Sequence, residues 1–172
     1  MLDKKMEKAL NGQIGAEFSS SYLYLAMSAY FDSAGLPGAA QWMKAQAQEE
    51  WFHGMKLYAY VNERGGRVLL AAIPQPPADW KSPLHVFQDV LAHEQKVTGL
   101  INGLANLALD IRDHATNIFL QWFVAEQVEE EATVGAVLAK LKLIGKDTSS
   151  LFTLDRELGQ RVFTPPPAKE QQ

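Results

Sequence analysis

Two sets of polar residues recur at the same spacing in the two halves of this chain. Glu17 is followed 33 residues later by Glu50 and, three residues further on, by His53. The same intervals recur 77 residues later in a second set, which consists of Glu94, Gln127 and Glu130. Residues three apart share a helix face, so Glu50 and His53 can hold one cation together. Carboxylates combined with one imidazole suit a hard or borderline divalent metal such as iron or manganese.

Each of these residues taken alone has a simpler interpretation. A single glutamate is typical of the solvated edge of a helix, and His53 alone would most simply be a hydrogen-bonded core histidine. Six polar positions in matched register are different, because buried carboxylates without partners are strongly destabilising unless cations neutralise them. The four glutamates carry four negative charges, which matches two divalent cations. The pattern therefore predicts a two-metal site, and the remaining alternative is a bundle with a buried polar network and no metal.

Helices must position these residues. Clusters of glycine and proline divide the chain into five helical segments, expected at about 4–33, 38–64, 83–109, 114–144 and 149–160. Apolar residues recur there at spacings of three and four, and the polar positions interrupt these stripes. Short links predict two antiparallel pairs, and the roughly eighteen residues between them can cross the length of a bundle. The predicted fold is all-α, a four-helix bundle with one long crossover and a short fifth C-terminal helix.

Composition excludes several classes of function. With 172 residues, 47% of them hydrophobic and 21% charged, the chain is typical of one globular domain, expected at 1–164 and followed by a polar tail at 165–172. The absence of cysteine excludes disulfides and thiolate metal sites. A net charge of −4 argues against nucleic acid and acidic membranes as partners. No apolar run approaches the length of a membrane span and no signal peptide is recognised, so a cytoplasmic location is expected.

The combination resembles the bacterial non-haem ferritins over essentially residues 1–160. The carrying segments are Glu17 with Tyr24 seven residues later, the run Gln48-Glu49-Glu50-Trp51-Phe52-His53, Glu94, and the run Glu126-Gln127-Val128-Glu129-Glu130. Their arrangement is the known ligand pattern of ferritin-like di-iron bundles. The resemblance implies an iron-storage ferroxidase, which oxidises Fe(II) with dioxygen or hydrogen peroxide and deposits ferric mineral inside a homo-oligomeric, twenty-four-subunit shell. A di-iron oxidase or peroxide scavenger without bulk storage is the alternative.

The resemblance also implies the iron ligands. By resemblance, Glu17, Glu50 and His53 bind the first iron of each subunit. Glu50 bridges the two ions, while Glu94 and Glu130 hold the second.

Further roles follow from the same resemblance. Gln127 would contact bound oxygen species or water, and Tyr24 would hydrogen-bond Glu94 and donate an electron. An ordinary core aromatic is the alternative for Tyr24. A third iron site would consist of Glu49, Glu126, Glu129 and Glu130.

The chain departs from the related bacterioferritins at positions that bear on haem. Trp51 stands where those proteins supply a haem-binding methionine, so haem is not expected. Glu131 is expected on a solvated face. Asp113 begins the fourth helix, either as its cap or, with Asp110 and Asn117, at a polar shell pore. The remaining histidines are expected at the surface or at helix ends, and they are His85, His93 and His114.

Overall fold

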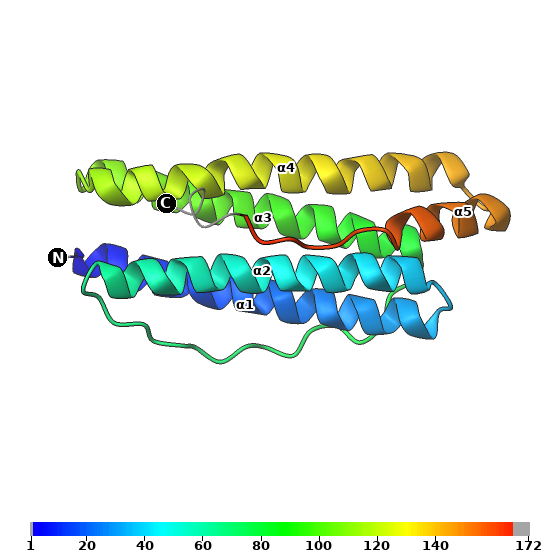
Figure 1. Cartoon of the computed structure of the whole chain (residues 1–172), viewed down its shortest axis with the longest axis horizontal. Coiled ribbons are helices and arrows are strands. Elements are labelled where there is room, and N and C mark those ends of the chain that lie inside the picture. The colour runs from blue at the N-terminus through cyan, green and yellow to red at the C-terminus, as the bar shows by residue number, and fades with distance from the viewer. Residues whose placement is uncertain (1, 167–172) are drawn as a thin grey trace.

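The computed structural model describes residues 2–166, which form a bundle of four long helices with a short fifth helix at one end (Figure 1). The helices are α1 (Lys4–Ser33), α2 (Pro37–Glu63), α3 (Pro83–Asp110), α4 (His114–Ile144) and α5 (Thr148–Leu158). The described part of the chain contains no strand. The all-α bundle is thus confirmed, with every boundary within two residues of its predicted place. The tail predicted at 165–172 lies outside the described residues from position 167 onward.

The ends of the helices follow the local sequence. The Asp3 carboxylate accepts hydrogen bonds from the first backbone N–H groups of α1, and Ser82 caps α3 in the same way. Asp113 accepts from the Thr116 backbone N–H at 3.1 Å and also pairs with the Arg64 guanidinium at 3.2 Å. The capping interpretation of Asp113 is therefore confirmed, and its ion pair ties the end of α2 to the start of α4.

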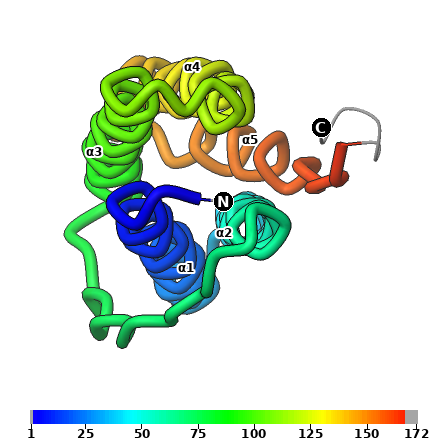
Figure 2. The backbone as a smooth tube through the Cα atoms, turned by 90° about the vertical axis from the view of Figure 1, so that its left-hand side faces the viewer, coloured from blue at the N-terminus to red at the C-terminus, as the bar shows by residue number. Residues whose placement is uncertain are grey.

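The crossover, residues 64–82, runs the length of the bundle outside α1 (Figures 1 and 2). This path makes α2 and α3 parallel, whereas the short links leave α1 and α2, and likewise α3 and α4, antiparallel. Asn11 fixes the crossover, because its side chain donates to the Arg67 carbonyl at 3.0 Å and accepts from the Leu69 backbone N–H at 2.6 Å. The crossover thereby brings polar residues of all four helices to one level.

The apolar core consists of two clusters rather than one. The first lies toward α5 and includes Phe31, Met43 and Leu141. The second lies toward the start of α1 and includes Leu10 and Leu57. The layer between the two clusters holds the buried polar residues of the bundle, so apolar packing encloses those residues from both ends.

α5 is docked onto the start of α2. No side chain of the preceding segment caps α2. Instead, the Asp155 carboxylate on α5 accepts hydrogen bonds from the Gly38 and Ala39 backbone N–H groups, at 3.0 and 2.8 Å. Gly38 is required there, because a Cβ at this position would lie 1.7 Å from the Asp155 carbonyl oxygen. The contact closes the bundle end and sets the direction of the chain after α5.

Replacing Asp155 with alanine should loosen this end of the bundle. The two N–H groups would lose their acceptor, at a cost of about 1–2 kcal/mol in the free energy of unfolding. Hydrogen exchange at Gly38 and Ala39 should accelerate. Glu157→Gln is the matched control, because this exposed residue of the same helix makes only a surface ion pair. Equal exchange protection in Asp155→Ala and Glu157→Gln would contradict the capping role.

Candidate metal centre

Four carboxylates and one histidine converge in the polar layer, and every long helix contributes. Glu17 comes from α1, Glu50 and His53 from α2, Glu94 from α3 and Glu130 from α4. All five side chains are at most 3% exposed. The prediction that these positions face the interior at one level is therefore confirmed.

α1 and α2 approach each other closely at this level because of a glycine. A Cβ added to Gly54 would lie 2.5 Å from the ring of Phe18, so a larger residue would push the helices apart. Glu17 and His53 are the immediate chain neighbours of these two residues. The close approach therefore helps to bring a carboxylate of α1 within reach of the imidazole on α2.

Glu17, Glu50 and His53 form the inner group. One potential ligand atom from each lies within 4.8 Å of the others. Glu17 Oε1 accepts a hydrogen bond from Gln13 at 2.9 Å, whereas Glu17 Oε2 is buried and has no partner. A cation bound among the three side chains would satisfy this oxygen.

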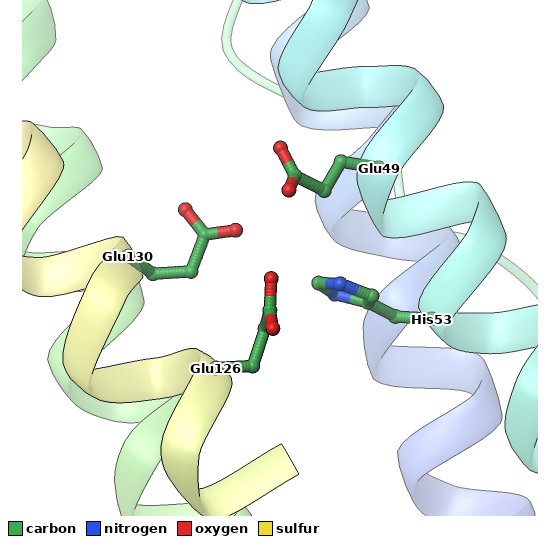
Figure 3. A group of neighbouring side chains, drawn as sticks. All are labelled: Glu49, His53, Glu126 and Glu130. Carbon is green, nitrogen blue, oxygen red and sulfur yellow. The ribbon is translucent and has the colours of Figure 1, made fainter. Parts of the chain in front are cut away.

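Glu49, His53, Glu126 and Glu130 form the outer group, in which α2 and α4 face each other (Figure 3). Their potential ligand atoms also lie within 4.8 Å of one another. Glu49 and Glu126 are half-buried, and Glu130 Oε1 is buried without a partner. Three residues expected at a third iron site are therefore together, and His53 is an additional member that the sequence did not indicate.

Glu129 differs from the other residues expected at the third site. Its side chain is exposed, and it belongs to neither group. Each residue turns an α-helix by about 100°, so the position before Glu130 points well away from the inward face. The structure thus leaves Glu129 outside both groups, although its charge is close enough to help raise the pKa of Glu126, and its part in a third site stays a prediction.

Glu94 is held by hydrogen bonds instead of belonging to either group. The Tyr24 hydroxyl donates a short hydrogen bond to Glu94 Oε1, and Gln127 Nε2 donates to Glu94 Oε2 at 3.3 Å. The expected contact between Tyr24 and Glu94 is therefore confirmed. Gln127 Nε2 also lies 3.3 Å from the Thr98 hydroxyl, which places this amide between α3 and α4.

Two amides that the sequence pattern did not indicate orient the carboxylates. Gln46 is fully buried, and its Nε2 donates to Glu130 Oε2 at 2.8 Å and to Glu50 Oε1 at 3.3 Å. Gln13 holds Glu17 in the same manner. Each amide precedes its glutamate by four residues, a spacing that places the two side chains on one helix face. This repeated Gln-to-Glu interval was the signal in the sequence.

Two residues expected at the surface have partners inside the bundle. His93 is half-buried, with Nε2 at 2.7 Å from the Ser20 hydroxyl and its ring edge-on to that of Tyr24. Burial lowers the pKa of His93 to about 4. The half-buried Glu131 accepts a hydrogen bond from Thr98 at 2.6 Å. The surface expectation is therefore wrong for both, because α1 covers His93 and α3 covers Glu131.

Burial shifts the titration of the whole layer. It raises the pKa of Glu17 and of Glu50 well above the usual range, and nearby carboxylates raise both further. Burial also raises the pKa of Glu94. For Glu130, burial first and then the charges of Glu49 and Glu94 raise the pKa to about 8. The metal-free layer therefore binds protons at neutral pH, and a cation would displace them.

The raised pKa of Glu130 predicts lower stability of the metal-free protein at high pH. A carboxyl whose pKa rises from 4.5 unfolded to about 8 folded stabilises the folded state fully below the lower value. This contribution is lost as the pH rises through the higher value. The denaturation midpoint of the apoprotein should therefore fall between about pH 5 and pH 9. Zn²⁺ should restore it at the upper end, because the cation replaces the lost protons.

The matched variants are Glu130→Gln and Glu63→Gln. Glu130→Gln should reduce the pH dependence and leave the part that comes from Glu17, Glu50 and Glu94, whereas Glu63→Gln, at the exposed end of α2, should leave it unchanged. A midpoint that stays constant or rises across this range in the apoprotein would contradict the assignment.

The fold and this layer define an all-α protein whose bundle interior is suited to divalent metal. The model of the ferritin-like domain family matches residues 7–144. The chain is 43% identical over 163 residues to a bacterial non-heme ferritin of Staphylococcus saprophyticus, covering 95% of this chain and 98% of that protein. It is 44% identical over 161 residues to one of Bacteroides fragilis, covering 94% and 100%. The chain therefore belongs to the ferritin family.

Solved structures agree with this assignment. A closed form of the Archaeoglobus fulgidus ferritin, engineered by mutagenesis, superposes with a TM-score of 0.94 at 52% identity, over 95% of this chain and 100% of that one. An open-pore ferritin from the same archaeon gives a TM-score of 0.93 at 52% identity, over 94% and 99%. The resemblance to bacterial non-haem ferritins is thus confirmed. Within the described residues, no helix combines the length and hydropathy that a membrane span requires.

Proposed function

We propose that this protein stores iron and oxidises Fe(II) to Fe(III) within the polar layer. One observation carries the proposal: Glu17 and Glu130 each have a buried carboxylate oxygen without a hydrogen-bond partner, and each belongs to a group of potential ligands that includes His53. Leaving such a group unpaired inside a protein is strongly destabilising. In a ferritin-family chain, divalent iron is the cation that best accounts for this arrangement.

In the proposed reaction, two ferrous ions each release one electron. Dioxygen accepts the two electrons with two protons to give hydrogen peroxide, and hydrogen peroxide accepts them with two protons to give two waters. Glu17 and His53 would hold the first ion, Glu94 and Glu130 the second, and Glu50 would bridge them. These side chains fix both ions and balance their charge, while the electron transfer belongs to iron.

Two neighbouring residues are proposed to assist the chemistry. Tyr24 would donate an electron to the oxidant in place of one from a ferrous ion, and its hydroxyl would pass its proton to Glu94, to which it is hydrogen-bonded. Gln127 would contact the oxidant or water, since its amide already borders Glu94. The outer group, with Glu129 at its exposed side, would take a third iron.

The storage part of the proposal concerns the assembled protein. Subunits would form a hollow, twenty-four-subunit shell in the cytoplasm, with the ferric product stored inside. Haem is not part of this proposal, because Trp51 stands where bacterioferritins supply a haem-binding methionine. The centroid of its ring lies 4.7 Å from that of the Phe18 ring. Loading the apoprotein with Fe(II) in air and measuring the iron retained per shell tests storage. A retained load of only two or three ions per subunit would favour the alternative oxidase or scavenger.

Replacing Glu50 and His53 together by alanine should abolish fast iron oxidation. The substitution removes the proposed bridge and the only imidazole among the proposed ligands, while the shell should still assemble. Stopped-flow absorbance after mixing with Fe(II) in air measures the initial rate. Gln48→Ala with Glu63→Gln is the control, because both residues are on the exposed face of α2. Oxidation at the parent's initial rate by the Glu50 and His53 variant would refute the proposed centre.

Replacing Gln127 with glutamate should make the centre retain iron longer. The new carboxylate would lie beside Glu94, where the amide now donates at 3.3 Å. At an effective dielectric near 20, one added charge about 4 Å from a metal contributes roughly 4 kcal/mol per unit of metal charge before desolvation. Ferrous affinity should rise, and the ferric absorbance after a small iron pulse should decay more slowly.

The matched control is Gln121→Glu, which adds the same charge at an exposed position of α4. If Gln127→Glu and Gln121→Glu both bound and cleared iron like the parent, the neutrality of Gln127 would have no functional role.

A further inference from the structure

The chain after α5 turns back along the bundle instead of leaving it. Residues 159–166, here called the C-terminal strap, run beside α2 on the side that faces α4 (Figures 1 and 2). Gln41 Nε2 donates to the Arg161 carbonyl at 3.3 Å, and the ring of Phe163 packs on that of Phe52 at 5.8 Å. Gln41 precedes Glu49 on α2 and Phe52 follows it, so the strap is held to α2 both before and after this residue.

Arg161 places its charge on a member of the outer group. Its Nη2 donates to Glu49 Oε2 at 2.7 Å, and both side chains are about one-fifth exposed. The guanidinium carbon lies 4.3 Å from the ring centroid of the buried Trp42, a cation–π contact that holds the arginine in position. The ion pair is therefore supported from two sides, unlike a pair between two free surface side chains.

The same ion pair is incomplete, which leaves it open to exchange. Arg161 bonds Glu49 through Nη2, while its Nη1 is enclosed and has no hydrogen-bond partner among residues 2–166. A guanidinium usually binds a carboxylate through two parallel hydrogen bonds, so this single bond leaves one donor unused. A divalent cation entering the outer group competes for the carboxylate that Arg161 now holds.

We propose that Arg161 is a positioning residue that limits metal retention at the outer group. In the metal-free protein its guanidinium neutralises and orients Glu49. When a metal ion occupies Glu49, His53, Glu126 and Glu130, the arginine either shares Glu49 or is displaced, and its charge repels the ion in both cases. Metal therefore stays there only briefly. This inference rests on the proposed function only in taking the outer group as a metal site.

The test is equilibrium binding of Zn²⁺ to the full-length metal-free protein. Zn²⁺ is redox-inert, so the result does not depend on whether the protein oxidises iron. Arg161→Gln keeps a planar hydrogen-bonding side chain but removes the charge. Arg161→Gln should lower the Kd of the weaker class of Zn²⁺ sites at least about tenfold, as expected when a repulsive charge within a few ångströms is removed. Transfer of that Zn²⁺ to a chelator should slow by a similar factor.

Three further variants separate the effect of the arginine's charge from its effect as an anchor of the strap. Arg161→Lys keeps the charge and should bind Zn²⁺ within about threefold of the parent. Arg156→Gln removes the same charge from an exposed position on α5 and should have no effect. In a Glu49→Gln background, Arg161→Gln should lower the Zn²⁺ Kd by a smaller factor than in the parent, because the carboxylate for which arginine and metal compete is gone and only the direct repulsion remains.

Several outcomes would overturn the inference. If Arg161→Gln left the Zn²⁺ affinity and the rate of Zn²⁺ transfer to the chelator unchanged, the ion pair would serve only to anchor the strap. Equal tightening by Arg161→Gln and Arg156→Gln would assign the effect to net charge. A parent that binds Zn²⁺ only at the inner group would show that the outer group is no metal site, and the proposed ferroxidase centre would remain testable by its oxidation rate. Tightening in Arg161→Gln without any iron oxidation would instead support this inference and refute the proposed function.

Discussion

Enclosing carboxylates in a low-dielectric layer is the constraint on which the rest of this structure depends. Glu17, Glu50, Glu94 and Glu130 lie between two apolar clusters that exclude solvent from both ends of the layer. Four full charges in that position would repel one another and lose their hydration. Burial raises the pKa of every one of these carboxyls, so they bind protons in the metal-free protein, and the protons relieve the repulsion. Bound cations would relieve the same repulsion while the carboxylates stay ionised.

The neutral donors around the layer follow from the same constraint. Gln13, Gln46 and Gln127 are amides, and Tyr24 is a phenol, so each orients a carboxylate without adding charge. A lysine or arginine in their place would form a permanent ion pair and compete with metal. Arg161 contacts Glu49 at the partly exposed edge rather than a fully buried carboxylate. The side chains that donate hydrogen bonds to Glu17 and Glu50 are therefore neutral amides, whereas the outer group also contacts a positive charge, that of Arg161.

The sequence predicted what local periodicity controls. The interval from Glu50 to His53 is a property of one helix, and its recurrence from Gln127 to Glu130 placed both pairs on inward faces. Glycine and proline marked the helix ends, so the bundle and its crossover followed. Whether a side chain is buried is harder to predict at the edge of an apolar stripe, where a small rotation about the helix axis decides the outcome. Glu126 and Glu129 are three residues apart, yet the first is half-buried and the second exposed.

Contacts between distant segments could not be predicted in this way. The strap lies on α2 because Asp155 docks α5 at Gly38, and nothing in the local pattern of either segment indicates the other. The same holds for His93, whose partner Ser20 lies on a helix 73 positions earlier. Residues that helix periodicity places in the buried layer were therefore found from the sequence, whereas residues that contact the layer from distant segments required the tertiary structure.

The two groups share His53, and this sharing constrains how an ion can move between them. Both groups are compact, with potential ligand atoms within 4.8 Å of one another, and Gln46 connects Glu50 of the inner group to Glu130 of the outer one. Under the proposed function, an ion leaving Glu17 and Glu50 would keep His53 as a ligand while it acquires Glu126 and Glu130, so it would not pass through a state without protein ligands. Exchanging ligands singly would keep the ion's charge partly balanced throughout, which would lower the barrier relative to full dissociation inside a buried layer. A shared imidazole also disfavours tight binding at both groups together. Under the proposed function, the inner group suits capture and oxidation, and the more exposed outer group suits departure.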